Sequence, residues 1–192
     1  MRTSIPIFPL NTVLYPGTLL PLKIFEQRYL QMTTACVRDA APFGVCRIRE
    51  GQEVGVPAVP DPVGCSALIV EWEMPHLGVF HLRTRGQMPF RIVQHTTHAD
   101  GLIQADVEWL SENAGEIRPE ALALCRRVLE QIVGKLGPDY FWPPLSYADP
   151  RWISYRLAEV LPLKEEEKQN LLALRTDGER LEQLHGLLRR TA

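Results

Sequence analysis

Over the first 110 residues, apolar positions alternate with polar ones in short stretches, as in half-buried β-strands. The clearest alternation spans residues 102–110, where four positions alternate with polar side chains: Ile103, Ala105, Val107 and Trp109. Further strands are predicted at 43–49, 63–74, 79–84 and 88–94, with turns at 75–78 and 98–101 and a proline-rich loop at 57–62. Six or seven short strands at this spacing predict a closed or nearly closed barrel.

The opening of the chain is apolar but interrupted by prolines at positions 6, 9, 16 and 21. Proline fixes φ and lacks a backbone donor, so we expect neither a helix nor a regular central strand here, but short strands and turns along a core. Leu20, Leu22 and Ile24 alternate with polar or proline positions and predict a strand. From there the spacing becomes helical and predicts a helix over about 26–41, with an apolar face of Phe25, Tyr29, Met32 and Cys36.

Beyond residue 113 the apolar spacing becomes helical. Pro119 suits a first helical turn, and the pair at 137–138 (GP) ends that helix. Asp149 predicts the N-cap of a second helix, and Pro162 opens a third, whose glutamates at 165–167 suit its positive end. Thr176 and Glu179 have the spacing of a capping box before a fourth helix. The predicted fold class is α+β, with a β-rich barrel at 1–113 that carries one inserted helix and a helical bundle at 114–192.

Composition limits the classes of function. The 192 residues are 45% hydrophobic and carry a net charge of −2, which gives no strong field for nucleic acid. Charge or proline interrupts every apolar stretch, and the start lacks the features of a signal peptide, so we expect a cytoplasmic protein with no membrane partner. The four cysteines, at 36, 46, 65 and 125, form no CxxC pair and are expected to be reduced and buried.

The opening motif resembles the amino-terminal domain of Lon protease, above all the small stand-alone bacterial proteins built around that domain. The resemblance lies in segments 7–10 (IFPL), 13–17 (VLYPG), 20–22 (LPL), 24–26 (IFE) and 28–29 (RY). Weaker matches follow at 43–45, 64–67, 86, 89–92 and 163–188. The resemblance implies a small barrel of the pseudouridine-synthase-and-archaeosine-transglycosylase (PUA-like) type. It also implies the substrate-binding part of Lon, without its ATPase or its serine–lysine protease.

The residues themselves predict no enzyme, cofactor or metal site. A phosphate-binding loop needs GxxxxGK[ST], whereas Gly134 and Lys135 are followed by Leu136 inside a predicted helix. His95 and His98 could be two zinc ligands, but zinc needs three or four, and the one nearby carboxylate is at position 100. No cysteine lies in the electropositive setting that activates a thiol nucleophile.

An aromatic segment at 137–150 is the first candidate binding site. Four prolines keep it from being helical, and it holds Tyr140, Phe141, Trp142 and Tyr147. These side chains either plug the junction between the two domains or form a patch that binds extended or unfolded protein segments. The expected partners are therefore exposed protein segments, together with a separate ATP-dependent protease.

The alternative function is RNA or nucleotide binding through the barrel. Its candidate residues are Arg83, Arg85 and Arg91, with Arg47 and Arg49 on another strand. The simpler interpretation is the polar face of antiparallel strands, paired with carboxylates at 71, 73, 106 and 108. The net negative charge favours this simpler interpretation, and hence protein over nucleic acid as the partner.

Overall fold

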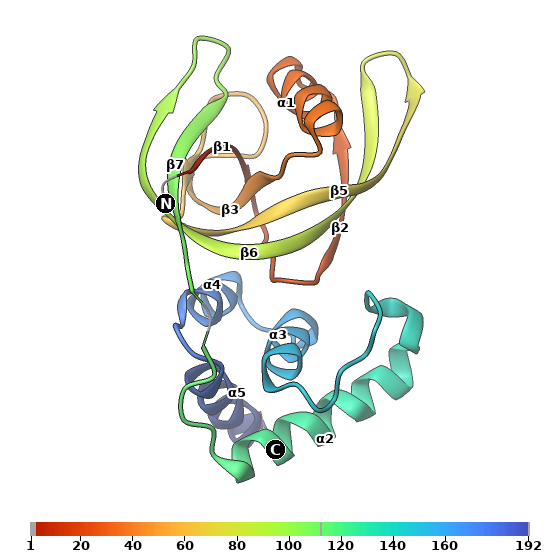
Figure 1. The fold of residues 1–192 in the computed structure, drawn as a ribbon, viewed down its shortest axis with the longest axis vertical. Helices are drawn as coiled ribbons and strands as arrows, with labels where there is room; N and C mark the ends of the chain where they lie inside the picture. The colour runs from red at the N-terminus through yellow and green to blue at the C-terminus, as the bar shows by residue number, and fades with distance from the viewer. Residues whose placement is uncertain (1–2, 112, 192) are drawn as a thin grey trace. The chain divides into compact units, whose positions relative to one another are not determined.

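The strands of the first unit close on themselves (Figure 1). The computed structural model describes residues 3–111 and 113–191 and separates into two compact units, Met1–Leu110 and Ser111–Ala192. The first unit contains one helix, α1 (Gln27–Asp39), and the strands β1 (Thr3–Leu10), β2 (Leu19–Ile24), β3 (Phe43–Glu50), β4 (Val59–Pro60), β5 (Val63–His76), β6 (Val79–Thr97) and β7 (Ile103–Trp109). The sheet order is β1-β7-β6-β5-β3-β4, and β1 also pairs with β3. Five strands therefore form a closed ring, as the sequence predicts.

β1 changes its neighbour halfway along its length and is not a regular central strand, as the sequence predicts. It pairs with β7 through Thr3–Ile7 and with β3 through Ile7–Leu10, so only Ile7 has a neighbour on both sides. Pro6 faces β7 alone and Pro9 faces β3 alone. Each proline thus has one edge without a ladder neighbour, where a missing N–H costs nothing.

β6 is a single strand of 19 residues and not the two strands that the sequence predicts. Gly86 lies in its middle, where the turn after β1 crosses the strand. The amide of Gly17 donates to the carbonyl of Gly86 (2.8 Å), and the amide of Gly86 donates to the carbonyl of Thr18 (2.9 Å). A Cβ at position 86 would collide with the Tyr15 carbonyl oxygen. This glycine therefore permits a close approach of two backbones within a continuous strand.

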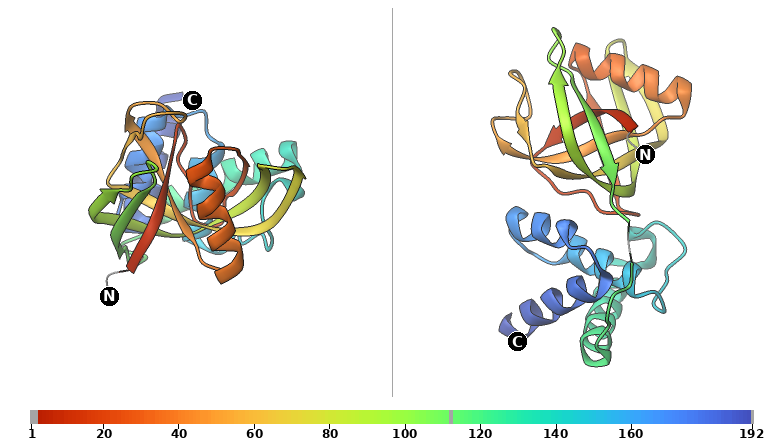
Figure 2. Two further views of the ribbon diagram at one scale, coloured as in Figure 1. Left: turned by 90° about the horizontal axis from the view of Figure 1, so that it is seen from above. Right: turned by 60° about the vertical axis from the view of Figure 1, so that its left-hand side comes forward.

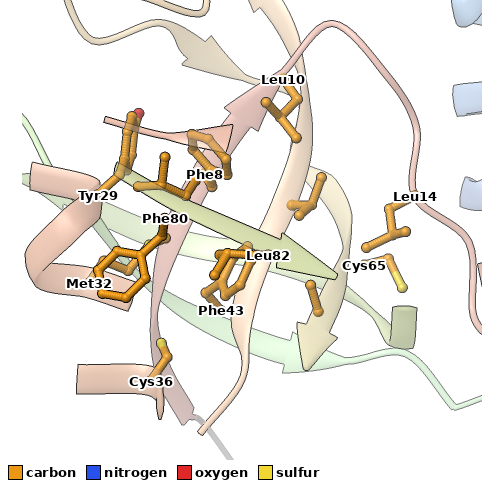
Figure 3. Packing of buried hydrophobic residues seen from close by; sticks show 13 residues of the cluster. Phe8, Leu10, Leu14, Tyr29, Met32, Cys36, Phe43, Cys65, Phe80 and Leu82 are labelled. Carbon is orange, nitrogen blue, oxygen red and sulfur yellow. The ribbon is translucent and has the colours of Figure 1, made fainter. Parts of the chain in front are cut away.

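α1 covers one end of the barrel (Figure 2). Its side chains Tyr29, Met32 and Cys36 point among Phe8, Phe43, Phe80 and Leu82 of the strands (Figure 3). The ring centroids of Phe8 and Tyr29 lie 4.3 Å apart. Phe25 is not part of this face, because the helix begins at Gln27 and the Phe25 side chain is 51% exposed.

The second unit is helical, with caps where the sequence predicts them. Its elements are α2 (Pro119–Leu136), η1 (Pro138–Tyr140), α3 (Pro150–Val160), α4 (Glu165–Ala173) and α5 (Asp177–Thr191). The Asp149 carboxylate accepts from the amide of Arg151 (2.9 Å) at the start of α3. Before α5, Thr176 Oγ1 accepts from the Glu179 amide (3.0 Å) and Glu179 Oε2 accepts from the Thr176 amide (3.1 Å), which confirms the capping box.

Arg180 of α5 is almost fully buried at the centre of this unit, a role that the sequence does not reveal. Its guanidinium donates to Asp177 Oδ1 (3.0 Å), Ser154 Oγ (3.2 Å) and the hydroxyl of Tyr155 (3.0 Å). It also donates to the carbonyl oxygen of Leu171 on α4 (3.1 Å). One side chain therefore bonds to α3, α4 and α5, and the buried charge is paired as burial requires.

Replacing Gly86 by alanine should destabilise the protein by at least about 2 kcal/mol, because the added methyl group overlaps a backbone oxygen that cannot move freely. Chemical denaturation followed by tryptophan fluorescence measures this loss. Gly134→Ala is the matched control, since a Cβ at that position of α2 meets nothing within 4 Å. The control should be neutral or stabilising by up to about 1 kcal/mol, and an equally stable Gly86→Ala protein would contradict the close approach.

The four thiols should be unreactive in the folded protein. Burial raises the pKa of Cys36 to about 11 and that of Cys125 to about 12, with further increases from Asp39 and Glu182 respectively. Burial raises the pKa of Cys46 as well. Only the thiolate attacks a disulfide reagent, so at pH 8 we expect less than one equivalent to react within minutes, and four equivalents after unfolding in guanidinium. A thiol that reacts rapidly in the native protein would contradict this burial.

Candidate functional site

The hairpin of β5 and β6 extends beyond the ring of five strands (Figure 1). The pairing of β3 with β5 ends at Phe43 and Ala67, and from there to the turn at Leu77 and Gly78 β5 pairs with β6 alone. On its other side, this part of β6 pairs with β2. We call residues 19–24 and 68–85 the overhang. It is a sheet of three strands with β5 along one edge.

One face of the overhang carries an arginine–glutamate ion pair and a histidine–glutamate contact. Arg83 Nη1 lies 3.2 Å from Glu71 Oε1, and His81 Nδ1 lies 3.2 Å from Glu73 Oε1. Both glutamates belong to β5, and their side chains are 62% and 71% exposed. Such solvated cross-strand pairs contribute less than about 1 kcal/mol each. Their importance is that they place two carboxylates, those of Glu71 and Glu73, on the edge strand.

The other face of the overhang is apolar. Leu22 of β2 lies opposite Leu82 of β6, and Leu82 lies opposite Trp72 of β5. The Trp72 ring also contacts the Phe80 ring edge to face, with centroids 5.8 Å apart. Leu82 is buried, but Trp72 is 53% exposed, and Met74 two residues further along the strand is 46% exposed. The apolar row therefore reaches the edge of the sheet uncovered.

The sequence analysis misses this patch, although a signal for it exists. Trp72 lies within the predicted strand 63–74, and its alternation with two glutamates is visible in the sequence. Exposure of Trp72 depends instead on where β3 begins relative to β5, and alternation within one strand does not reveal that.

The aromatic segment at 137–150 divides into buried and exposed side chains. Phe141 is 3% exposed and its ring contacts that of Trp152 on α3, with centroids 6.1 Å apart. Tyr147 contacts the same Trp152 ring at 5.2 Å, and Trp142 is half-buried. Tyr140 is the exposed member, at 52%. Two of the four predicted site residues, Phe141 and Tyr147, thus pack against Trp152, and Tyr140 is the one that is open to a partner.

The predicted arginine strip alternates with carboxylates. Besides the Glu71 partner of Arg83, Arg91 lies opposite Glu108 in the ladder, and Arg47 Nε lies 2.7 Å from Asp61 Oδ2. Arg85 lies within hydrogen-bonding distance of the Gln87 amide oxygen, at 3.1 Å. Arg83 and Arg47 are paired with carboxylates and release few counterions from a phosphate backbone, so this geometry favours the polar-face interpretation.

The histidine pair at the end of β6 gains no third ligand. The Asp100 carboxylate accepts from the Leu102 amide (2.9 Å), and within residues 3–111 and 113–191 no three His, Cys, Asp or Glu side chains are grouped to hold a metal. None of the helices described here is long and apolar enough to span a bilayer.

Comparisons with known proteins agree on one family. The family model of the "ATP-dependent protease La (LON) substrate-binding domain" matches residues 4–190. The Lon protease of Roseiflexus castenholzii is 28% identical over 193 residues, which cover 97% of this chain and 24% of that protein. The Lon protease of Anaeromyxobacter dehalogenans is 28% identical over 140 residues, which cover 70% of this chain and 16% of that protein. The chain therefore spans a quarter or less of the length of these curated relatives.

Solved structures show the same fold. The Lon N-terminal domain protein from Xanthomonas campestris has a TM-score of 0.79 and 35% identity, covering 95% of this chain and 96% of that one. The N-terminal domain of a Mycobacterium avium complex Lon protease has a TM-score of 0.68 with the same coverage, and at 16% identity it shows the fold alone. These findings confirm the resemblance to Lon amino-terminal domains and the predicted α+β fold.

Alanine substitutions at Phe141 and Tyr140 should distinguish the buried side chain of the aromatic segment from the exposed one by their effects on stability. Removing the buried Phe141 ring should cost about 3 kcal/mol or more of stability, because it leaves a cavity beside Trp152. Tyr140→Ala is the control and should change the free energy of unfolding by less than about 1 kcal/mol, since its side chain is half exposed. Thermal and chemical denaturation measure both, and equal effects would contradict the division described here.

Proposed function

We propose that this chain, which belongs to the family of Lon substrate-binding domains, binds exposed or unfolded segments of other proteins. The observation that carries the proposal is the uncovered apolar row of the overhang, which ends in Trp72 and Met74. Tryptophan is enriched among the residues that dominate protein interfaces. Methionine adapts to partners of different shape because its side chain is flexible and polarizable.

The family supports a protein as the partner. The matching family model describes the substrate-binding domain of a protease, and the substrate of a protease is itself a protein. In this chain Gly134 and Lys135 lie inside α2 and not in a phosphate-binding loop. We therefore propose a role in recognition, as a cytoplasmic adaptor or quality-control factor that delivers bound proteins to a separate ATP-dependent protease.

The size of the patch suggests modest affinity. Burying an exposed large apolar side chain contributes about 1.5–3 kcal/mol, and association costs at least about 4 kcal/mol of translational and rotational freedom. Two half-exposed side chains, Trp72 and Met74, thus provide weak and reversible binding, which suits a factor that must release what it binds. Tyr140 of the helical unit is a second candidate contact, as an exposed aromatic ring of the segment 137–150.

RNA binding is the less favoured function. It would need an arginine surface free to bind phosphates, whereas Arg83, Arg91 and Arg47 each lie against a carboxylate-bearing residue. Salt distinguishes the two functions, because phosphate contacts weaken steeply with salt and apolar contacts do not.

Trp72→Ser combined with Met74→Ser should weaken binding of a permanently unfolded protein by at least about tenfold, the equivalent of about 1.4 kcal/mol. Fluorescence anisotropy of a labelled, reduced and alkylated protein measures the affinity. Met88→Ser with Leu136→Ser is the matched control, because each of these residues is 48% exposed and lies outside the overhang. A control that loses as much affinity would contradict the location of the site on the overhang.

The same titration should change less than about twofold between 50 and 500 mM salt. An RNA oligonucleotide serves as the competing ligand. Salt-sensitive binding of that RNA, with no binding of the unfolded protein, would replace the proposed function by the alternative.

A further inference from the structure

We infer that the free edge of β5, at residues 69–74, accepts an extended segment of a partner as an additional strand, and that the preferred segment alternates basic with apolar side chains. This inference rests on the proposed function and deepens it. An apolar patch alone would bind partners without selectivity. Strand addition provides backbone hydrogen bonds as well, and the charges beside the patch select the partner's sequence.

The edge is open along its backbone. After Ala67, β5 has β6 as its single ladder neighbour among the described residues, so the N–H and C=O groups that point away from β6 have no strand to bond. The ladder with β6 is regular from Glu71 to Glu73 and shifts register on either side, between Ile69 and Glu71 and between Glu73 and His76. Unpaired groups of this kind are a template for strand addition. Pro75 lacks an N–H and limits the template at the tip of the hairpin.

The charged face defines one half of the partner's pattern. Glu71 and Glu73 each have a basic neighbour on the β6 side, and their other side faces the open edge. A strand added there places the Cβ atom of every second residue about 5 Å from the Cβ atom of one of these glutamates. Lysine or arginine at those positions continues the cross-strand charge pairing, whereas glutamate or aspartate is repelled.

The apolar face defines the other half. The intervening side chains of an added strand lie on the face of Trp72 and Met74 and extend the row that runs from Leu22 through Leu82. They cover the exposed area of both side chains. The preferred segment therefore reads basic, apolar, basic opposite the regular stretch from Glu71 to Glu73 and continues with apolar side chains beyond it.

A second copy of this chain fits the charged part of the edge poorly. Antiparallel self-pairing centred on Trp72 places Glu71 of each copy opposite Glu73 of the other, and centring on either glutamate places it opposite itself. Like charges directly opposite each other are destabilising. Charges and proline also protect edges from aggregation, but such protection does not account for an exposed tryptophan and methionine on the same strand.

Synthetic peptides test the inference directly. A capped peptide of alternating lysine and valine should bind the full chain at least tenfold more tightly than a peptide of alternating glutamate and valine. It should exceed by the same factor a peptide of the same composition in which all the lysines stand at one end. Two N-methylated forms probe the backbone, one methylated at every lysine and one at every valine. Because alternate amides of a strand point to opposite edges, one form should lose at least tenfold in affinity and the other should bind nearly as before.

Charge reversal on the protein provides the second arm. Glu71→Lys with Glu73→Lys should reverse the preference, so that the glutamate–valine peptide binds more tightly. Glu120→Lys with Glu130→Lys, on the exposed side of α2, is the control of equal net charge and should leave the preference unchanged. Circular dichroism spectra show whether both variants are folded.

The outcomes separate this inference from the function on which it rests. If the labelled unfolded protein binds but no peptide is preferred, or if both N-methylated forms bind equally well, strand addition is overturned and apolar recognition stands. Loss of binding to the unfolded protein itself would overturn the proposed function. Pairing of two β5 edges, seen as a dimer that Glu71→Lys strengthens, would identify the occupant as a second copy and contradict the inference.

Discussion

The parallel pairing of β1 with β3 is the constraint on which the rest of the barrel depends. Because β1 bridges β7 and β3, five strands close into a ring, and the start of β3 at Phe43 fixes how far β5 has a second neighbour. Everything on β5 beyond Ala67 then lies outside the ring. The open edge and the uncovered Trp72 are thus direct results of closing the barrel where it closes.

The helical unit has a different organisation, in which one buried cation serves as the centre. Arg180 bonds to residues of α3, α4 and α5, so polar contacts as well as buried apolar side chains hold these helices together. Such a network tolerates little change, because removing any acceptor leaves a charge buried without its partner. A substitution at an exposed position such as Tyr140 should therefore be better tolerated than one at this centre.

Local chemistry in the sequence predicts much of the fold. Alternation locates β7, the Asp149 N-cap locates α3, and the capping box of Thr176 and Glu179 locates α5. The two-sided pairing of β1 is not predictable in this way, because the cost of a proline depends on which edge has a neighbour. The continuity of β6 through Gly86 likewise depends on the distant turn at 15–18. The exposed row ending in Trp72 depends on the lengths of three strands and lies outside what a pattern in one strand can reveal.

The turn at Leu77 and Gly78, at the tip of the hairpin, has a consequence for how this family can diversify. Gly78 has a φ of 79° and Leu77 is 98% exposed, so the tip tolerates changes in length. Side chains alternate between faces, however, so an insertion of one residue between Ala67 and Trp72 would move the tryptophan to the charged face. Relatives that keep the apolar face of the overhang should therefore differ in the length of this hairpin by an even number of residues in each strand.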